Sequence, residues 1–151
     1  MLILLDIDGV MLPAASWRTT ENLSDGFPGF TKHAVKNLKK LLSETHASIV
    51  LISTHKTRFS NSEWRNIFRN RGIEATIDVL ENENDSNRKD EIVNWYNTHS
   101  NEDFIIIDDD KSLNDLPERI KHNLVQTKSL VGFNEESYNV AKNIIRDAHP
   151  A

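Results

Sequence analysis

The hydrophobic positions of the chain form short apolar runs that alternate with longer segments of helical periodicity. Runs this short do not favour a helix and are typical of strands buried on both faces of a sheet. They occupy residues 1–5, 48–52 and 104–107. A partly alternating segment at 73–80 and a short run at 123–127 predict two further strands.

Amphipathic segments separate these runs and predict helices at residues 31–45, 61–71, 88–98 and 135–147. Strands that alternate with helices indicate a parallel sheet with helices on both faces. We therefore predict an α/β fold, a three-layer doubly wound and mostly parallel sheet of about five strands. The chain has 151 residues and no internal repeat or linker, so we expect a single domain over residues 1–151.

Two carboxylates follow the first apolar run at once, Asp6 and Asp8, and Gly9 comes next. If the strand geometry continues, both carboxylates leave the same face, because side chains alternate with a period of two. Like charges at the end of a buried strand need compensation by a shared proton or a bound cation. Gly9 allows a sharp turn there. An ordinary solvated acidic turn is the alternative interpretation, since the pattern Asp-x-Asp-Gly also occurs in loops and calcium sites.

Polar residues also follow the second and third apolar runs. Ser53 and Thr54 come after the second run, and the carboxylates Asp108, Asp109 and Asp110 come after the third. Ligands of open α/β sheets bind beyond the carboxyl ends of the parallel strands. The three strand ends therefore predict one shared polar site.

Four motifs follow one another along the chain: Asp6-Ile7-Asp8-Gly9-Val10, Ser53 with Thr54, the basic pair Arg88-Lys89, and Asp108-Asp109. In this order they resemble the haloacid-dehalogenase-like (HAD) phosphohydrolase superfamily, over about residues 1–132. The resemblance implies a HAD-like, Rossmann-like fold. The segment from Gly9 to Ser48 must also supply a helix, which leaves no room for a substantial cap domain, so we expect a capless member.

The resemblance also implies roles for the acidic residues. Asp6 would attack phosphorus and form an aspartyl-phosphate, and Asp8 would act as general acid and base. Mg²⁺ suits an oxygen-only site that also holds phosphate. Its expected ligands are the Asp6 carboxylate, the Asp8 backbone carbonyl and an aspartate of the third strand end, Asp109 or Asp108.

The remaining motifs would bind the phosphoryl group. Ser53 would donate to a phosphoryl oxygen, with Thr54 as the donor if the register differs by one residue, and Gly9 belongs to the same substrate-binding set. A lysine at the start of the helix binds phosphate in the family, and here Lys89 fits by residue type whereas Arg88 fits by its spacing to the apolar face. The choice between these two stays open.

A basic segment follows the hydroxyl pair and contains His55, Lys56 and Arg58. These side chains would be suitable donors to a phosphate held at the strand end. A basic loop that only increases solubility is an equally good interpretation.

Composition limits the function classes. A net charge of −5 and a pI near 5.6 argue against a general nucleic-acid-binding surface. The chain has no cysteine, which excludes disulfides, thiolate zinc sites and a cysteine nucleophile, and fits the cytoplasm, where we expect the protein. No segment approaches the roughly 18 consecutive apolar residues that span a membrane, and no signal peptide is recognisable.

We therefore expect a Mg²⁺-dependent phosphatase whose partner is a phosphorylated substrate, either a small molecule or an exposed phosphate on a macromolecule. A repair-type phosphatase acting on nucleic-acid ends (3′ or 5′) is one alternative. A non-catalytic metal- or phosphate-binding regulatory module is another, although the presence of both Asp6 and Asp8 weighs against it. A receiver-like signalling domain is disfavoured because its phosphate-accepting aspartate lies on a later strand.

Overall fold

The computed structural model describes residues 1–14, 21–81 and 87–148. Five parallel strands form one sheet in the order β3-β2-β1-β4-β5. The strands are β1 (Leu2–Leu5), β2 (Ser48–Leu51), β3 (Ile77–Val79), β4 (Phe104–Asp108) and β5 (Leu124–Gln126). The central strand β1 is hydrogen-bonded on both sides, with Leu5 opposite Leu51 of β2 and Ile107 of β4.

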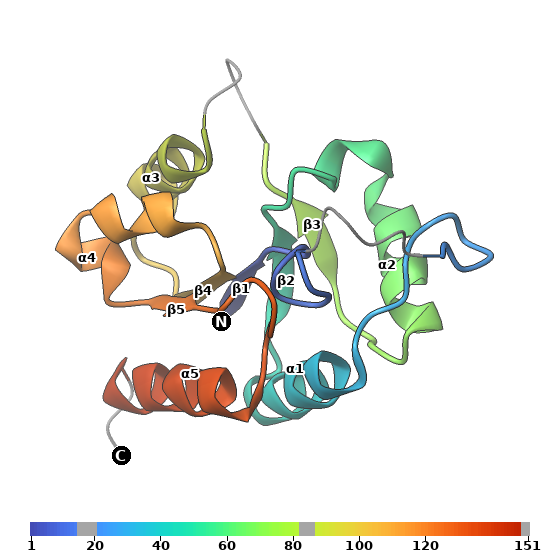
Figure 1. Ribbon diagram of the computed structural model, residues 1–151. Helices are drawn as coiled ribbons and strands as arrows, with labels where there is room; N and C mark the ends of the chain where they lie inside the picture. Colours follow the sequence, from blue (N-terminus) through green and yellow to red (C-terminus); the bar gives the residue numbers. More distant parts are fainter. Residues whose placement is uncertain (15–20, 82–86, 149–151) are drawn as a thin grey trace.

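Helices cover both faces of the sheet (Figure 1). The helices α1 (Lys32–Thr45) and α5 (Glu135–Ala148) lie on one face, and α3 (Arg88–His99) and the short α4 (Glu118–Lys121) lie on the other. The helix α2 (Asn61–Asn70) lies beside the edge strand β3. This arrangement confirms the predicted doubly wound α/β fold, with a sheet that is parallel throughout.

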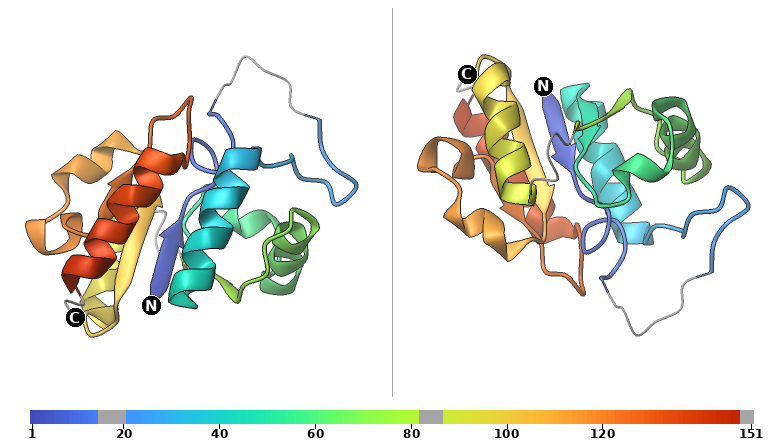
Figure 2. Two further views of the ribbon diagram at one scale, coloured as in Figure 1. Left: turned by 90° about the horizontal axis from the view of Figure 1, so that it is seen from below. Right: turned by 90° about the horizontal axis from the view of Figure 1, so that it is seen from above.

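The described residues between β1 and α1 form no helix or strand, so they build no separate cap domain. Two views at right angles to Figure 1 show this part of the chain as a loop beside the helical layers (Figure 2). Among the described residues, every helix is too short or too polar to cross a membrane.

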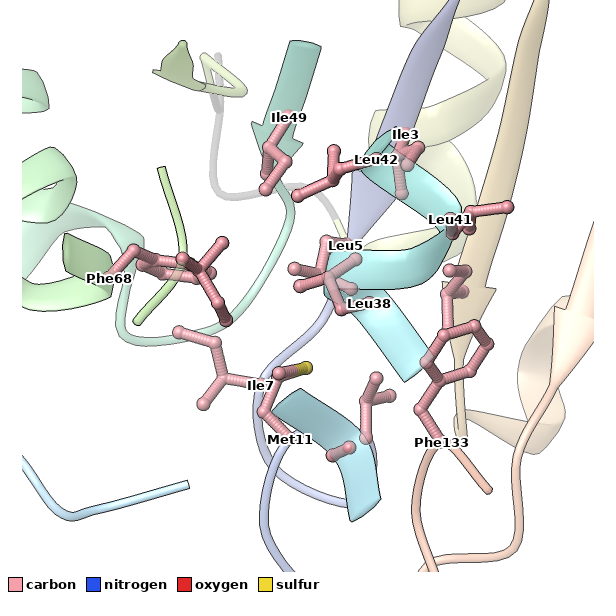
Figure 3. Close-up of a cluster of buried hydrophobic side chains, with 14 of the residues drawn as sticks. Ile3, Leu5, Ile7, Met11, Leu38, Leu41, Leu42, Ile49, Phe68 and Phe133 are labelled. Carbon is pink, nitrogen blue, oxygen red and sulfur yellow. The ribbon is translucent and has the colours of Figure 1, made fainter. Parts of the chain in front are cut away.

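Alternation along β1 divides the core into two parts. Ile3 and Leu5 pack with α1 on one face, where Figure 3 shows Leu5 beside Leu38 and Ile3 beside Leu42 of that helix. Leu4 packs on the opposite face, together with Ile92 of α3. Ile7 is still buried with Ile3 and Leu5, so the alternation continues beyond the strand. The side chain of Asp6, two residues after Leu4, therefore points toward the α3 side of the sheet.

The third strand is shorter than the segment 73–80 predicts. Only residues 77–79 pair, and they pair with β2 alone because β3 is an edge strand. The preceding Gly72 has a φ of +86° and begins the exit from α2, and the amide of Ile73 still donates to the carbonyl of Phe68 in that helix. The apolar residues Ile73 and Ala75 thus reflect burial in the core cluster that includes Phe68 of α2, and not pairing in the sheet.

A buried ion pair fastens the segment before α1 to the end of α2. Arg71 donates through Nη1 to Asp25 Oδ2 at 2.6 Å and through Nη2 to Asp25 Oδ1 at 3.1 Å. The two side chains are only 3% and 9% exposed. The hydrogen bonds from Arg71 lower the pKa of Asp25 well below its usual range, although burial opposes this.

We expect Asp25→Asn to lower the free energy of unfolding by about 3 kcal/mol near neutral pH, because Arg71 would stay buried without a charge partner. The lowered folded-state pKa of Asp25 means that this contribution is present above the unfolded pKa of about 3.9 and is lost as the pH falls from there toward the folded pKa. Urea unfolding of both proteins at neutral pH and below the unfolded pKa measures the difference.

A matched control is Glu74→Gln, because Glu74 pairs with Arg69 at 3.7 Å where both side chains are largely exposed. This variant should change the stability by less than about 1 kcal/mol. An Asp25→Asn variant as stable as the control would contradict the role of the buried pair.

Candidate active site

The ends of β1 and β4 bring three carboxylates together. The amide of Asp6 donates to the carbonyl of Ile107 at 3.0 Å, so Asp6 continues the pairing of the two strands and lies beside Asp108. One carboxylate oxygen from each of Asp6, Asp108 and Asp109 lies within 4.8 Å of the others. Asp6 and Asp108 are buried, which makes this group, here called the acidic cluster, an electrostatically costly arrangement.

Arg88 supplies a positive charge to the acidic cluster from the first position of α3. Its Nη1 is 2.5 Å from Asp108 Oδ2 and 3.5 Å from Asp6 Oδ1. Burial lowers the pKa of Arg88, but the negative charges of Asp108 and Asp6 outweigh that effect and raise it. Arg88 therefore stays charged between the two carboxylates.

One guanidinium does not balance the acidic cluster. The pKa of Asp6 is raised, first by burial and then by the charge of Asp108, while Arg88 acts in the opposite direction. Burial likewise raises the pKa of Asp108. Three converging carboxylates with one neighbouring cation form an oxygen-only donor set that fits a hard divalent ion such as Mg²⁺. Asp6, Asp108 and Asp109 are thus the side chains able to hold a metal.

Gly9 is required where the chain turns next to Asp109. It has a φ of +81°, and a Cβ built on it would lie 2.0 Å from Asp109 Oδ2. The carbonyl of Gly9 accepts a hydrogen bond of 2.7 Å from the buried Thr127 hydroxyl. The sequence predicts the turn at this glycine, but not the close approach of Asp109, which only the fold produces.

Asp8 is not among the three carboxylates of the acidic cluster. Its Oδ2 is 2.7 Å from Nε2 of His55, and its side chain is 44% exposed. The alternation of side chains predicts that Asp8 and Asp6 leave the same face, but it does not predict this partner. His55 belongs to the basic segment for which phosphate binding or solubility were the two interpretations.

Ser53 lies beside these groups because β2 runs parallel to β1. The amide of Ile52 donates to the carbonyl of Leu5 at 3.0 Å, and the next residue, Ser53, is fully buried. Its Oγ accepts a hydrogen bond of 3.1 Å from the amide of His55. Thr54 is exposed. Phosphate binding by Ser53 or Thr54 stays a prediction.

Lys56 fits neither interpretation of the basic segment, phosphate binding or solubility, because its side chain takes part in a buried ion pair. It is buried, and its ammonium group contacts the carboxylate of Glu91, which is also buried. The backbone carbonyl of Lys56 accepts a hydrogen bond of 3.0 Å from Nε1 of Trp64. The Lys56–Glu91 ion pair joins the segment after Ser53 to α3, the helix that begins with Arg88.

Of the two basic candidates, it is Arg88 whose side chain contacts the acidic cluster, at Asp6 and Asp108. Lys89 is half-buried and stays a prediction as a phosphate-binding residue. Glu91 and His55 are the residues that the motifs did not identify. A weak signal existed for Glu91, because it lies four positions before Trp95 and hence on the apolar side of α3.

Comparison with protein-family models matches residues 2–138 to the family described as "HAD domain in Swiss Army Knife RNA repair proteins". A search of curated proteins found no match. The matched region begins with β1 and ends within α5. It therefore includes the acidic cluster together with Arg88, Ser53 and His55.

We expect Gly9→Ala to weaken divalent-cation binding, because the added Cβ would displace the Asp109 carboxylate. The positive φ also costs about 1–2 kcal/mol for a residue with a side chain. Calorimetric titration with Mg²⁺ and thermal unfolding measure the two effects separately.

Gly26→Ala is the matched control. Gly26 has a φ of +86°, but a Cβ there meets no atom within 4 Å. This variant should show the backbone cost without any change in cation binding. Equal cation binding by both variants would contradict a steric link between Gly9 and Asp109.

We expect Lys56→Met to destabilise the protein by about 3–5 kcal/mol, because Glu91 would remain as an unpaired buried carboxylate. The double variant Lys56→Met with Glu91→Leu should recover most of this loss, since it removes both charges. Urea unfolding of the single and double variants provides the measurement.

Arg65→Ala is a suitable comparison, because Arg65 contacts Asp78 at 3.9 Å with both side chains exposed. We expect a change below about 1 kcal/mol in that case. A loss of similar size in Arg65→Ala and Lys56→Met would show that the burial of the Lys56–Glu91 pair has no energetic consequence.

Proposed function

The chain belongs to the family of HAD domains in Swiss Army Knife RNA repair proteins, and on this basis we propose that it is a Mg²⁺-dependent phosphatase acting through an aspartyl-phosphate on Asp6. Membership in this family supports the assignment of the chain as a phosphohydrolase of the HAD type. The observation that carries the proposal is the acidic cluster, in which Asp6, Asp108 and Asp109 meet within 4.8 Å beside Arg88.

Asp6 is the nucleophile of the first step. Its carboxylate oxygen attacks phosphorus, a P–O bond to Asp6 forms, and the P–O bond to the leaving group breaks. Arg88 favours the ionised form of Asp6 that this attack requires. The Asp6 carboxylate, the Asp8 backbone carbonyl and Asp109 or Asp108 would hold Mg²⁺, which would supply charge neutralisation to the phosphoryl oxygens.

Asp8 moves the protons. In the first step its protonated carboxyl gives a proton to the leaving oxygen. In the second step the Asp8 carboxylate takes a proton from water as the water oxygen attacks phosphorus. The bond to Asp6 then breaks, inorganic phosphate leaves, and Asp8 is protonated again. The contact of the Asp8 side chain with His55, and its place outside the three grouped carboxylates, support this role, because a metal-bound carboxylate could not carry the proton.

The phosphoryl oxygens need further hydrogen-bond donors. We assign this role to the hydroxyl of Ser53 or Thr54 and to the basic side chain of Arg88 or Lys89. Gly9 leaves space for the substrate at the turn. The buried position of Ser53 at the end of β2 supports this assignment. The contacts of Arg88 with Asp6 and Asp108 favour Arg88 over Lys89.

For the substrate we propose a terminal phosphate of RNA. The description of the matched family as part of RNA repair proteins supports this class. The absence of a cap domain among the described residues is consistent with a large substrate, because a chain end can reach the strand ends without passing beneath a second domain. The acidic net charge is consistent with recognition of a terminus and not of a long nucleic-acid surface.

We expect magnesium-dependent release of phosphate from para-nitrophenyl phosphate and from oligoribonucleotides phosphorylated at one end. Asp6→Asn should lower this activity by about a thousandfold or more, because an amide cannot replace the nucleophile. The experiment measures phosphate release with Mg²⁺ and with a chelator. Acid quenching with radiolabelled substrate tests for the covalent intermediate in the native chain.

Asp115→Asn is the control, because Asp115 is an exposed aspartate at the end of the short 3₁₀ helix Lys111–Asp115. This variant should leave the activity unchanged. Turnover that persists in Asp6→Asn would disprove the nucleophile. Turnover of the aryl phosphate without any preference for phosphorylated RNA ends would retain the phosphatase and reject the substrate.

A further inference from the structure

The carboxylate of Asp8 has one described side-chain partner, and that partner is outside the acidic cluster. The carboxylates that meet within 4.8 Å among the described residues are those of Asp6, Asp108 and Asp109. Asp8 instead contacts Nε2 of His55 through Oδ2 at 2.7 Å. With 44% of its side chain exposed, Asp8 has little packing of its own to select one rotamer.

The imidazole of His55 is itself held in place. It packs edge-on against Phe27, with ring centroids 5.5 Å apart and an interplanar angle of 82°. The backbone amide of His55 donates to Ser53 Oγ at 3.1 Å, at the start of the turn that follows β2. Its Nδ1 lies 3.5 Å from Nη1 of Arg58. The ring is 29% exposed, so it is anchored on several sides and still borders the site.

Arg58 favours one tautomer of His55, because its Nη1 faces Nδ1 of the ring at 3.5 Å. Its guanidinium lies over the rings of Phe27 and Phe59, at 5.6 Å and 5.4 Å from their centroids. A guanidinium only donates, so this contact favours the tautomer in which Nδ1 of His55 accepts and Nε2 carries the N–H group. A neutral imidazole in this tautomer donates to Asp8 Oδ2, and no other described side chain is bonded to that carboxylate.

We propose that His55 is a positioning residue that orients the Asp8 carboxyl for proton transfer, an inference that rests on the proposed phosphatase function. The Nε2–H group binds Oδ2 and holds the carboxyl in one orientation against His55. The transferable proton is therefore carried on Oδ1. His55 itself neither attacks phosphorus nor gains or loses a proton in the reaction.

This role predicts a dependence on the leaving group. When the P–O bond to the leaving group breaks, the leaving oxygen takes the proton of Asp8 Oδ1 and Asp8 becomes a carboxylate. A nitrophenolate is stable without that proton, whereas the alkoxide of a sugar or an alcohol is not. Misplacing the Asp8 carboxyl should therefore slow the hydrolysis of alkyl phosphates far more than that of para-nitrophenyl phosphate.

We expect His55→Ala to lower kcat for a phosphorylated oligoribonucleotide or glycerol phosphate by about 10- to 100-fold, which is part of the roughly 10²- to 10⁴-fold that general acid catalysis contributes. The same variant should lower kcat for para-nitrophenyl phosphate by less than about threefold, with KM little changed for both. His55→Gln should restore much of the loss, because its side-chain amide can also donate to Oδ2.

His99→Ala is the matched control, because His99 stacks on Trp95 at the opposite end of α3 from Arg88. It should leave both activities unchanged. Equal losses on both substrates in His55→Ala, or no rescue by His55→Gln, would overturn the positioning role while the phosphatase function stands. A native chain that hydrolyses neither substrate would overturn both proposals.

Nitrogen NMR of the imidazole provides a readout that does not depend on turnover. The native protein should show His55 with its proton on Nε2, and Asp8→Ala should change the Nε2 resonance while His99 is unaffected. A proton on Nδ1 in the native neutral ring would also overturn the proposal.

Discussion

Charge balance in the acidic cluster is the constraint on which the rest of the structure depends. Asp6 and Asp108 lie almost entirely out of water, where neighbouring like charges repel strongly. Arg88 offsets this repulsion from the first position of α3, although a cation there opposes the helix dipole by about 0.3–1 kcal/mol. A hydrogen bond between charged groups contributes about 1.5–3 kcal/mol, so the carboxylates decide where this arginine lies.

The turn after β1 is held by residues from the far end of the chain. Thr127 donates to the carbonyl of Gly9, and the amide of Phe133 donates to the carbonyl of Val10 at 2.8 Å. A Cβ on Gly132 would lie 2.6 Å from that same oxygen of Val10. The orientation of the acidic residues therefore depends on the segment after β5 as much as on β1 itself.

Much of this arrangement follows from the sequence, and the family match over residues 2–138 confirms the resemblance to the HAD superfamily. Buried strands are short apolar runs, and parallel strands end at one edge, so the meeting of Asp6 with Asp108 is predictable. The choice of Arg88 over Lys89 as the cluster's partner depends on how α3 is rotated against the sheet, which tertiary packing decides. The contact of His55 with Asp8 joins two loops, and no periodicity within either loop encodes it.

The central place of β1 has a consequence for the biosynthesis of the chain. Its neighbour β4 begins at Phe104, and the turn that follows β1 is completed only by Thr127 and Phe133. During translation the first acidic motif thus leaves the ribosome long before the groups that neutralise or fasten it. The acidic end of the sheet stays hydrated until the segment up to Phe133 has emerged, and its assembly is governed by contacts between distant parts of the sequence.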